Sequence, residues 1–334
     1  MAHVYGLKSE QILFRDQAGA LAGGVLRTHA RDVDGAGRFP EESIAALGDA
    51  GFLGLCVPRE NGGAGEGLPL FAAVAELLAQ ECGSTAMVFV MHVAATQAIA
   101  ASRTLARKGE LLTSIAAGKH LTTLAFSEKG SRSQFWAPVS RLEQANGAFV
   151  ISAEKSWVTS AHHANSYVAS AQQPGAASPL ESTLFLVRRS KGPVRVLTAF
   201  DGLGLRGNES APVVFDRAPV AREDLLTPLG EGAATMLQIV LPWFNVGTSA
   251  MAIGLCRGAM AATAGHLQAG TFAHTGTGLR DLPTLRARLA DMSVRTEQAA
   301  ALLARSLEEV ESGGAAAPLF VLQTRLPRSR RRSR

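Results

Sequence analysis

Three cysteines are the first candidates for metal or redox chemistry in this sequence. Cys56, Cys82 and Cys256 are far apart, and none belongs to a Cys-x-x-Cys pair. Structural zinc sites and thiol redox centres use closely spaced cysteines. The cysteine pattern therefore predicts no metal site and no disulfide framework, and it fits a reducing cytoplasm.

The loops that commonly hold nucleotide cofactors are also missing from the sequence. No G-x-G-x-x-G follows a strand-like segment, and no G-x-x-x-x-G-K-[ST] occurs. The expected strands and helices do not alternate as they do in doubly wound folds. If the chain holds a nucleotide cofactor, we therefore expect a site other than a Rossmann site.

Several isolated side chains could do chemistry but also have structural explanations. His92 lies in an apolar stretch, which favours a core histidine or a pocket wall over a catalytic base. The adjacent His162 and His163 begin a loop, where a surface position is the default. A tryptophan such as Trp136 or Trp243 is usually a packing residue. Residue type alone therefore does not define a site.

The net charge of +5 is concentrated at the end of the chain. Six arginines lie in the last ten residues without an acidic residue, which leaves −1 for residues 1–324. A body this close to neutral lacks the basic surface that binds nucleic acid, so we expect no nucleic-acid partner. The first 17 residues carry charges early and do not resemble a secretory signal.

Two uncharged stretches, residues 82–102 and 232–256, are long enough to cross a bilayer. Both are rich in Ala and Gly and contain polar residues. We interpret them as helices buried in a bundle or at a subunit interface, and we expect no membrane span.

The order of expected elements is helical, then β, then helical again. The 334 residues suffice for two or three domains. Strand patterns begin near residue 121, and Asn146-Gly147 between alternating runs predicts a hairpin over 139–158. Pro242 predicts a kink in a helix over 231–268. The expected fold class is α+β, with these domains: an N-terminal all-α domain (1–120), a middle antiparallel β-barrel or sandwich domain (121–228), an incomplete C-terminal α domain (229–324) and a basic tail (325–334).

Several segments, taken in chain order, resemble the acyl-CoA dehydrogenase family. Residues 51–65 (GFLGLCVPRENGGAG) are similar to its "GF.GL.VPEEYGGAG" run, and residues 125–133 (AFSEKGSRS) to its "TEPGAGS" segment. Residues 155–161 (KSWVTSA) are similar to "K.WITNA", and residues 204–207 (GLRG) to the "GLR" loop. Residues 289–292 read "LADM". Because the matches run in family order, together they indicate a C-terminally truncated member.

This resemblance implies an FAD site in the middle domain. The Trp157 position places an indole beside the isoalloxazine ring, and Thr159 points a hydrogen bond at the N5 edge. Ser127 addresses the pyrimidine end, and Ser133 lies near the pyrophosphate and the substrate's pantetheine. The resemblance implies these cofactor-binding residues: Phe126, Ser127, Ser133, Trp157, Val158 and Thr159. It implies Ser133 and His92 as substrate-binding residues.

The implied reaction is α,β-dehydrogenation of an acyl-CoA thioester, with α-proton abstraction and transfer of the β-hydrogen as hydride to flavin N5. The catalytic base is not found: one family position is occupied by Phe244-Asn245, and the other would follow the end of this sequence. Ala269 replaces the arginine of the "R..FG" segment that contacts FAD pyrophosphate. The family also implies a homo-oligomer that passes electrons to an acceptor flavoprotein.

Two other functions remain open at this point. A flavin-dependent monooxygenase of the same fold needs no carboxylate at the base position. An inactive truncated scaffold, or a nucleic-acid binder acting through the arginine tail, needs no flavin chemistry at all.

Overall fold

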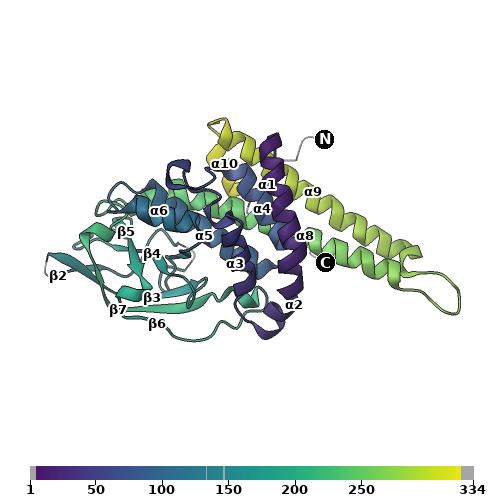
Figure 1. Cartoon of the computed structure of the whole chain (residues 1–334), viewed down its shortest axis with the longest axis horizontal. Helices are drawn as coiled ribbons and strands as arrows, with labels where there is room; N and C mark the ends of the chain where they lie inside the picture. Colours follow the sequence, from purple (N-terminus) through teal and green to yellow (C-terminus); the bar gives the residue numbers. More distant parts are fainter. Residues whose placement is uncertain (1–4, 133, 146, 325–334) are drawn as a thin grey trace, which may run out of the picture. The chain divides into compact units, whose positions relative to one another are not determined.

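In the computed structural model of this chain, the described residues are 5–132, 134–145 and 147–324; of residue 191, only the backbone is described. They form two compact units (Figure 1). One comprises residues up to 23, residues 68–83 and residues from 245 onward; the other comprises residues 24–67 and 84–244. Three predicted features lie outside the described residues: Ser133, the hairpin residue Asn146 and the basic tail 325–334.

The β-rich unit contains two sheets that pack face to face. A three-stranded sheet has the order β1-β4-β5, and a four-stranded antiparallel sheet has the order β2-β3-β7-β6. Tyr167 and Phe185 from the first sheet share one core with Ile151 and Phe215 from the second. The strands are β1 (Thr122–Ala125), β2 (Leu142–Ala145), β3 (Ala148–Val158), β4 (Ser166–Gln172), β5 (Ser182–Arg188), β6 (Val194–Val196) and β7 (Ala211–Val220).

This arrangement confirms the predicted sandwich, with one difference. Strands β1 and β4 pair in parallel, so the middle region is not wholly antiparallel. The reason is that β2 and β3 intervene in the sequence but join the other sheet, which lets β4 return beside β1 in the same direction.

Helices of the same unit cover the smaller sheet with an apolar layer. Side chains of α5, α6 and the smaller sheet share a second buried core. The unit contains α2 (Arg27–Ala36), α3 (Glu41–Asp49), α5 (Gly83–Ala101, from Ser84 onward), α6 (Lys108–Ala116) and α7 (Gly232–Thr235), besides short 3-10 turns. The helix α5 is long and apolar enough to cross a membrane, but 72% of its most apolar window is buried, as in the core helix of a soluble protein.

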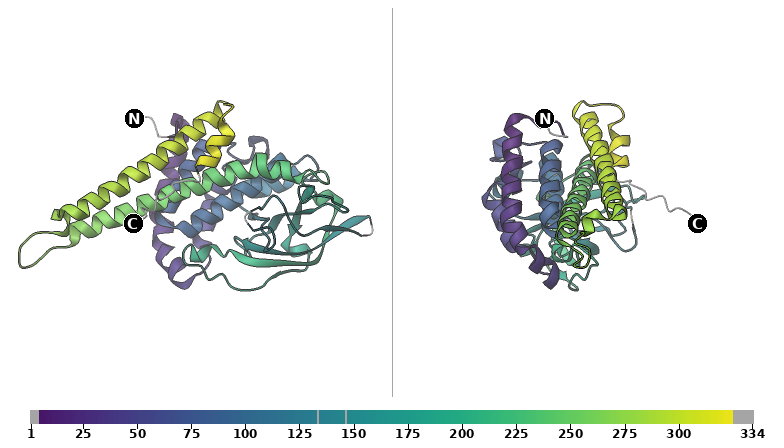
Figure 2. Two further views of the ribbon diagram at one scale, coloured as in Figure 1. Left: turned by 180° about the vertical axis from the view of Figure 1, so that it is seen from behind. Right: turned by 90° about the vertical axis from the view of Figure 1, so that its right-hand side faces the viewer.

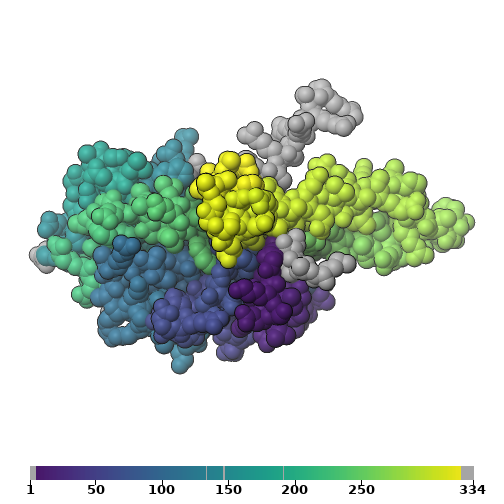
Figure 3. All heavy atoms as spheres, turned by 90° about the horizontal axis from the view of Figure 1, so that it is seen from above, coloured from purple at the N-terminus to yellow at the C-terminus, as the bar shows by residue number. Residues whose placement is uncertain are grey.

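The other unit is helical throughout. It contains α1 (Ser9–Leu21), α4 (Leu68–Glu81), most of α8 (Leu241–Ala269), α9 (Pro283–Glu311) and α10 (Ala317–Gln323). Helices α8 and α9 run side by side (Figure 2), joined by contacts such as the ion pair of Arg257 with Glu297. Most residues at the hairpin end of this pair, 270–288, are exposed, and Figure 3 shows one face of it.

Two helical segments contain a wider turn. A π-turn over Ala22–Leu26 separates α1 from α2 at the helix-weakening pair Gly23-Gly24. A second π-turn, Met236–Val240, precedes Pro242. Proline cannot donate a hydrogen bond to the carbonyl four residues back, and the wider turn accommodates that loss.

The long apolar segment Gly232–Ala269 also passes the length and composition test for a membrane span, with 50% of its window buried.

Candidate functional site

The structure brings two of the predicted cofactor segments together. Phe126 and Ser127 follow β1 directly, and Trp157 and Val158 end β3. The amide of Ser156 donates to the carbonyl of Ser127 over 2.8 Å. This hydrogen bond joins two residues that are 29 positions apart and places Ser127 next to the end of β3 that carries Trp157.

Trp157 has an unusual backbone and an unusual environment. Its φ is +57°, and it lies where the register of β3 against β7 shifts between Lys155 and Val158. A β-bulge of this kind redirects a side chain, and a bulky residue at positive φ stores strain that is common at functional sites. The Trp157 side chain is 67% exposed. The strained bulge near the end of β3 therefore presents a large aromatic surface to the outside of the sandwich.

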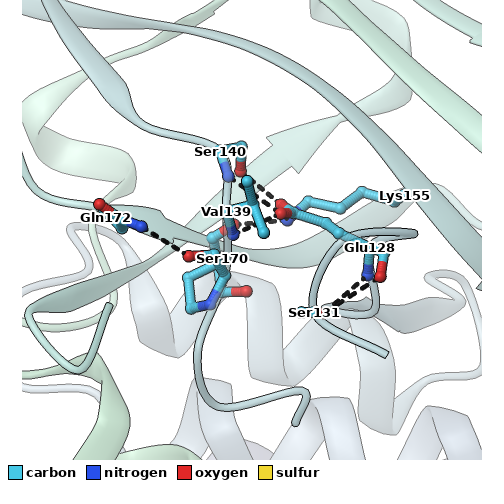
Figure 4. Close-up of polar contacts among 8 residues, drawn as sticks. Glu128, Ser131, Val139, Ser140, Lys155, Ser170 and Gln172 are labelled. Atoms are coloured by element: carbon cyan, nitrogen blue, oxygen red, sulfur yellow. Dashed lines mark hydrogen bonds and ion pairs between the residues drawn. The ribbon is translucent and has the colours of Figure 1, made fainter. Parts of the chain in front are cut away.

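A buried ion pair between Lys155 and Glu128 joins the segment after β1 to the end of β3. Lys155 is 0% exposed, and its Nζ donates to Glu128 Oε1 at 2.5 Å and to the carbonyl of Ser170 at 2.6 Å (Figure 4). The other carboxylate oxygen of Glu128 accepts from the amides of Val139 and Ser140. The Ser140 hydroxyl also donates to Glu128. One carboxylate thus holds the loop after β1, the start of the hairpin and the end of β3.

The environment of Glu128 favours its ionised form. Burial alone would raise the pKa of this carboxyl, but the Lys155 charge and the hydrogen bonds from Lys155 and Ser140 together lower it. The carboxylate therefore stays charged at neutral pH, and its lone pairs are used within the protein. We interpret Glu128 and Lys155 as residues that position the site rather than react in it.

A second loop supports the residues that follow Trp157. The amide of Ser160 donates to the carbonyl of Asn208, and the hydroxyls of Thr159 and Ser210 share a 3.0 Å hydrogen bond. Ser160 and Glu209 both have positive φ. The loop at 205–210, which contains part of the predicted "GLR" segment, therefore fixes the backbone of 159–161.

Glu209 joins two histidines of this region. Its carboxylate accepts from Nδ1 of His162 at 2.5 Å and from Nδ1 of His163 at 2.7 Å. The ring of His163 stacks on Phe39 with a centroid separation of 3.9 Å. Hydrogen bonding to Glu209 is the largest influence on the pKa of His163 and raises it, with a smaller contribution from Glu41.

This raised pKa predicts a pH dependence of stability. A group with a raised folded-state pKa contributes its full stabilisation below the unfolded value, 6.5 for His163, and loses it as the pH rises through the folded value. We expect the free energy of unfolding from urea titrations to fall as the pH rises above 6.5, and His163→Asn to remove that decrease. The exposed His266 supplies a control, His266→Asn. If the free energy of unfolding of His163→Asn decreases with pH as steeply as that of the wild type, groups other than His163 cause the decrease.

Two other predicted cofactor residues, Phe126 and Val158, are buried. Phe126 is buried and its ring is stacked parallel to that of Phe135, with centroids 6.2 Å apart. Val158 is buried in the sheet opposite Ala211. Ser133 lies outside the described residues, so its predicted contacts with cofactor and substrate stay predictions.

His92 is part of the core. It is 0% exposed, and burial lowers its pKa to about 4. One ring nitrogen is 3.1 Å from the carbonyl of Leu53, and the other accepts from the amide of Thr122 at 3.1 Å. With both nitrogens engaged by backbone groups, His92 connects α5 to β1, and its predicted contact with the substrate stays a prediction.

Three residues of the site, Glu128, Lys155 and Glu209, have no role that the sequence alone predicts. The first two stand inside the quoted segments, directly after Ser127 and two residues before Trp157, and that spacing was the available signal. Glu209 follows the "GLR" segment, but nothing in the sequence indicates its contact with residues 47 positions earlier. Among the described residues, no cluster of three or more His, Cys, Asp or Glu side chains could hold a metal ion.

The fold agrees with the comparisons with known proteins. Residues 8–119 match the acyl-CoA dehydrogenase N-terminal domain, and residues 123–218 match the acyl-CoA dehydrogenase middle domain. The chain belongs to the acyl-CoA dehydrogenase family.

Individual relatives cover most of the chain. A probable acyl-CoA dehydrogenase of Bacillus subtilis is 24% identical over 301 residues, which are 88% of this chain and 77% of the relative. The structure of butyryl-CoA dehydrogenase from Megasphaera elsdenii is similar with a TM-score of 0.88 at 19% identity, over 95% of this chain and 83% of that chain. An FAD complex of PigA is similar with a TM-score of 0.83 at 18% identity, over 96% and 88% of the two chains.

Proposed function

We propose that this chain is an FAD-dependent oxidoreductase that introduces a double bond between the α and β carbons of an acyl-CoA thioester. The observation that carries the proposal is the exposure of Trp157. Its indole is held by a strained bulge in β3, at the position where the resemblance to the family implies the flavin ring. The positive φ of this bulky residue stores strain of the kind that is common at functional sites, and a planar cofactor would cover the exposed indole.

The residues present fit FAD in chemical type. Trp157 offers an aromatic face, and Ser127, which is only half-buried, offers a hydroxyl. Thr159 can accept the Ser210 hydrogen bond and still donate its own proton to a flavin ring atom, because a hydroxyl has one donor and two acceptor positions. When bound, FAD supplies the acceptor for a hydride from the substrate. The similarity to a structure described as an FAD complex supports this assignment.

No residue of this chain is assigned as the base that removes the α-proton. At one family position stand Phe244 and Asn245, and the Asn245 side chain is buried and donates to the carbonyl of Val321 at 3.4 Å. An amide cannot accept a proton near neutral pH. The acid closest in sequence, Glu231, is exposed ahead of α7. The proposal therefore depends on the flavin site.

The proposal extends to the electron donor and acceptor, the assembly and the location of the protein. We propose an acyl-CoA thioester as the reductant and an electron acceptor flavoprotein or similar protein as the oxidant, because bound flavin must be reoxidised for turnover. We also propose a homo-oligomer in the cytoplasm. The relatives named for acyl-CoA substrates support the substrate class.

Anaerobic mixing with acyl-CoA thioesters tests the activity. We expect the yellow protein, loaded with FAD, to lose its flavin colour with at least one member of a series of different acyl lengths. The matching free acids serve as controls, because they lack the thioester that acidifies the α-proton. Flavin that stays bound and oxidised with every thioester would reject dehydrogenation while leaving the flavin site intact.

A further inference from the structure

A small polar pocket lies at one end of the three-stranded sheet. It has a volume of about 280 Å³ and is lined by His120, Asn165, Arg188, Arg189 and Ser190. Strand register explains why these residues meet: Thr122 pairs with Ser166, and Ser166 pairs with Arg188. The pocket therefore collects the residues that precede β1 and β4 and those that end and follow β5.

This pocket is separate from the proposed flavin site. Strand β1 begins beside the pocket at Thr122 and ends at Ala125, and Ser127 follows that end. At a rise of about 3.3 Å per residue, Thr122 and Ser127 are more than about 10 Å apart. The pocket and Ser127 therefore lie at opposite ends of the same strand.

The lining is basic and contains no carboxylate. Arg188 is paired with Asp224 at 3.6 Å, which offsets part of its charge. Arg189 is exposed and has no ion pair with a carboxylate in the described part of the chain. Guanidinium groups present several N–H donors in a planar arrangement that matches the oxygens of phosphate, sulfate or carboxylate.

The walls of the pocket are held in place by hydrogen bonds. Asn165 Oδ1 accepts from the amide of Leu121, and the Asn165 carbonyl accepts from the amide of Arg189. A third bond joins His120 Nε2 to the Ser166 hydroxyl at 2.7 Å. The three strand ends are therefore fixed before any ligand arrives, and this preorganisation lowers the entropy cost of binding.

From this geometry we propose that the pocket is a binding site for a small oxyanion of the phosphate or sulfate class. Its volume is at the low end of the range for small-molecule sites, which suits one tetrahedral anion or the terminal phosphate of a monoester. The two arginines supply the charge, and Asn165 and Ser190 form the neutral polar wall. Neither the flavin nor the acyl-CoA substrate is needed for this binding.

Proton uptake should accompany binding. Burial is the main reason why the pKa of His120 is lowered to about 4, and the charges of His92 and Arg188 add to the effect. An anion in the pocket offsets the Arg188 charge and raises the pKa of His120. Because linkage is reciprocal, the anion should bind more tightly as the pH falls from 7 towards 5.

Sulfate is the appropriate probe because its charge does not change over this pH range. We expect saturable chemical-shift changes of the Arg189 and His120 side chains when sulfate replaces chloride at constant ionic strength. Arg189→Gln should weaken binding about tenfold, since it removes one charge-assisted contact. The control is Arg195→Gln, which changes an exposed arginine in β6 of the other sheet and should leave the affinity unchanged.

The outcomes separate the possible ligands. Competition by inorganic phosphate but not by 3′-AMP would identify a free-ion site, and competition by both would identify a site for phosphate monoesters. No saturable change with sulfate, or equal weakening by Arg189→Gln and Arg195→Gln, would overturn the proposal. Loss of the expected pH dependence in His120→Gln, with binding retained at pH 7, would support the linkage to His120.

Discussion

Lys155→Met is expected to destabilise the protein by about 3–5 kcal/mol, the usual cost of removing one partner of a buried ion pair. Methionine preserves most of the aliphatic volume, but the Glu128 carboxylate then remains buried without a counter-charge. The hydrogen bonds from Val139 and Ser140 stay in place, so the lower half of the range is expected. Urea unfolding at pH 7 measures the change.

Two comparisons make this result specific. Lys129→Met removes a neighbouring but exposed ammonium and should leave the unfolding midpoint unchanged. The double variant Glu128→Gln/Lys155→Met should be more stable than Lys155→Met, because it removes the unpaired charge. The penalty should also shrink as the pH falls towards 4.5, the ordinary pKa of Glu128, because a protonated carboxyl needs no counter-charge. Equal stability of Lys155→Met and the wild type would contradict the proposed role of the pair.

Gly207→Ala is expected to lower stability by about 1–3 kcal/mol, as overpacking of a closed site does. A Cβ at this position would lie 2.4 Å from the carbonyl oxygen of Arg38 and 2.4 Å from a methyl group of Val33. Because the first of these is a backbone atom, the loop 205–210 must move. Its Asn208 and Ser210 contacts with residues 159–160 would weaken, so flavin affinity should fall as well.

Gly204→Ala provides the matched control in the same loop. A Cβ at Gly204 would meet no atom within 4 Å, and its backbone is not in the left-handed region. This variant should retain both stability and flavin affinity. If the two alanine variants behave alike in urea unfolding and in FAD titration, close packing at Gly207 does not support the site.

The sequence predicted the order of elements well because that order depends on local patterns. The hairpin at Gly147, the strands of the sandwich and the long helices each follow from periodicity and turn residues within about twenty positions. The parallel pairing of β1 with β4 depends on which sheet each strand joins, which local patterns do not specify. The domain boundaries at residues 120 and 228 stay a prediction.

The candidate site was less predictable, and for a physical reason. The residues around Trp157 were found through the resemblance, but the complete burial of Lys155 was not expected, because lysine is rarely buried without a partner and its partner is 27 residues away. His92 is the opposite case: its apolar surroundings indicated a core residue, and the structure places it there. The contact of Glu209 with His162 and His163 joins two loops that only the folded sandwich brings together.

The central claim is that the end of β3 around Trp157 forms part of a flavin site. Titration of the protein with FAD tests this claim most directly. Saturable quenching of flavin fluorescence at about one FAD per chain is expected for the wild type. Trp157→Ala should bind FAD about 5- to 150-fold more weakly, because base and ring stacking on an aromatic residue contributes about 1–3 kcal/mol. Leu180→Ala, which changes an exposed apolar side chain between β4 and β5, should bind as the wild type does. Failure of the wild-type protein to bind FAD, or equal affinity of Trp157→Ala and the wild type, would contradict the claim.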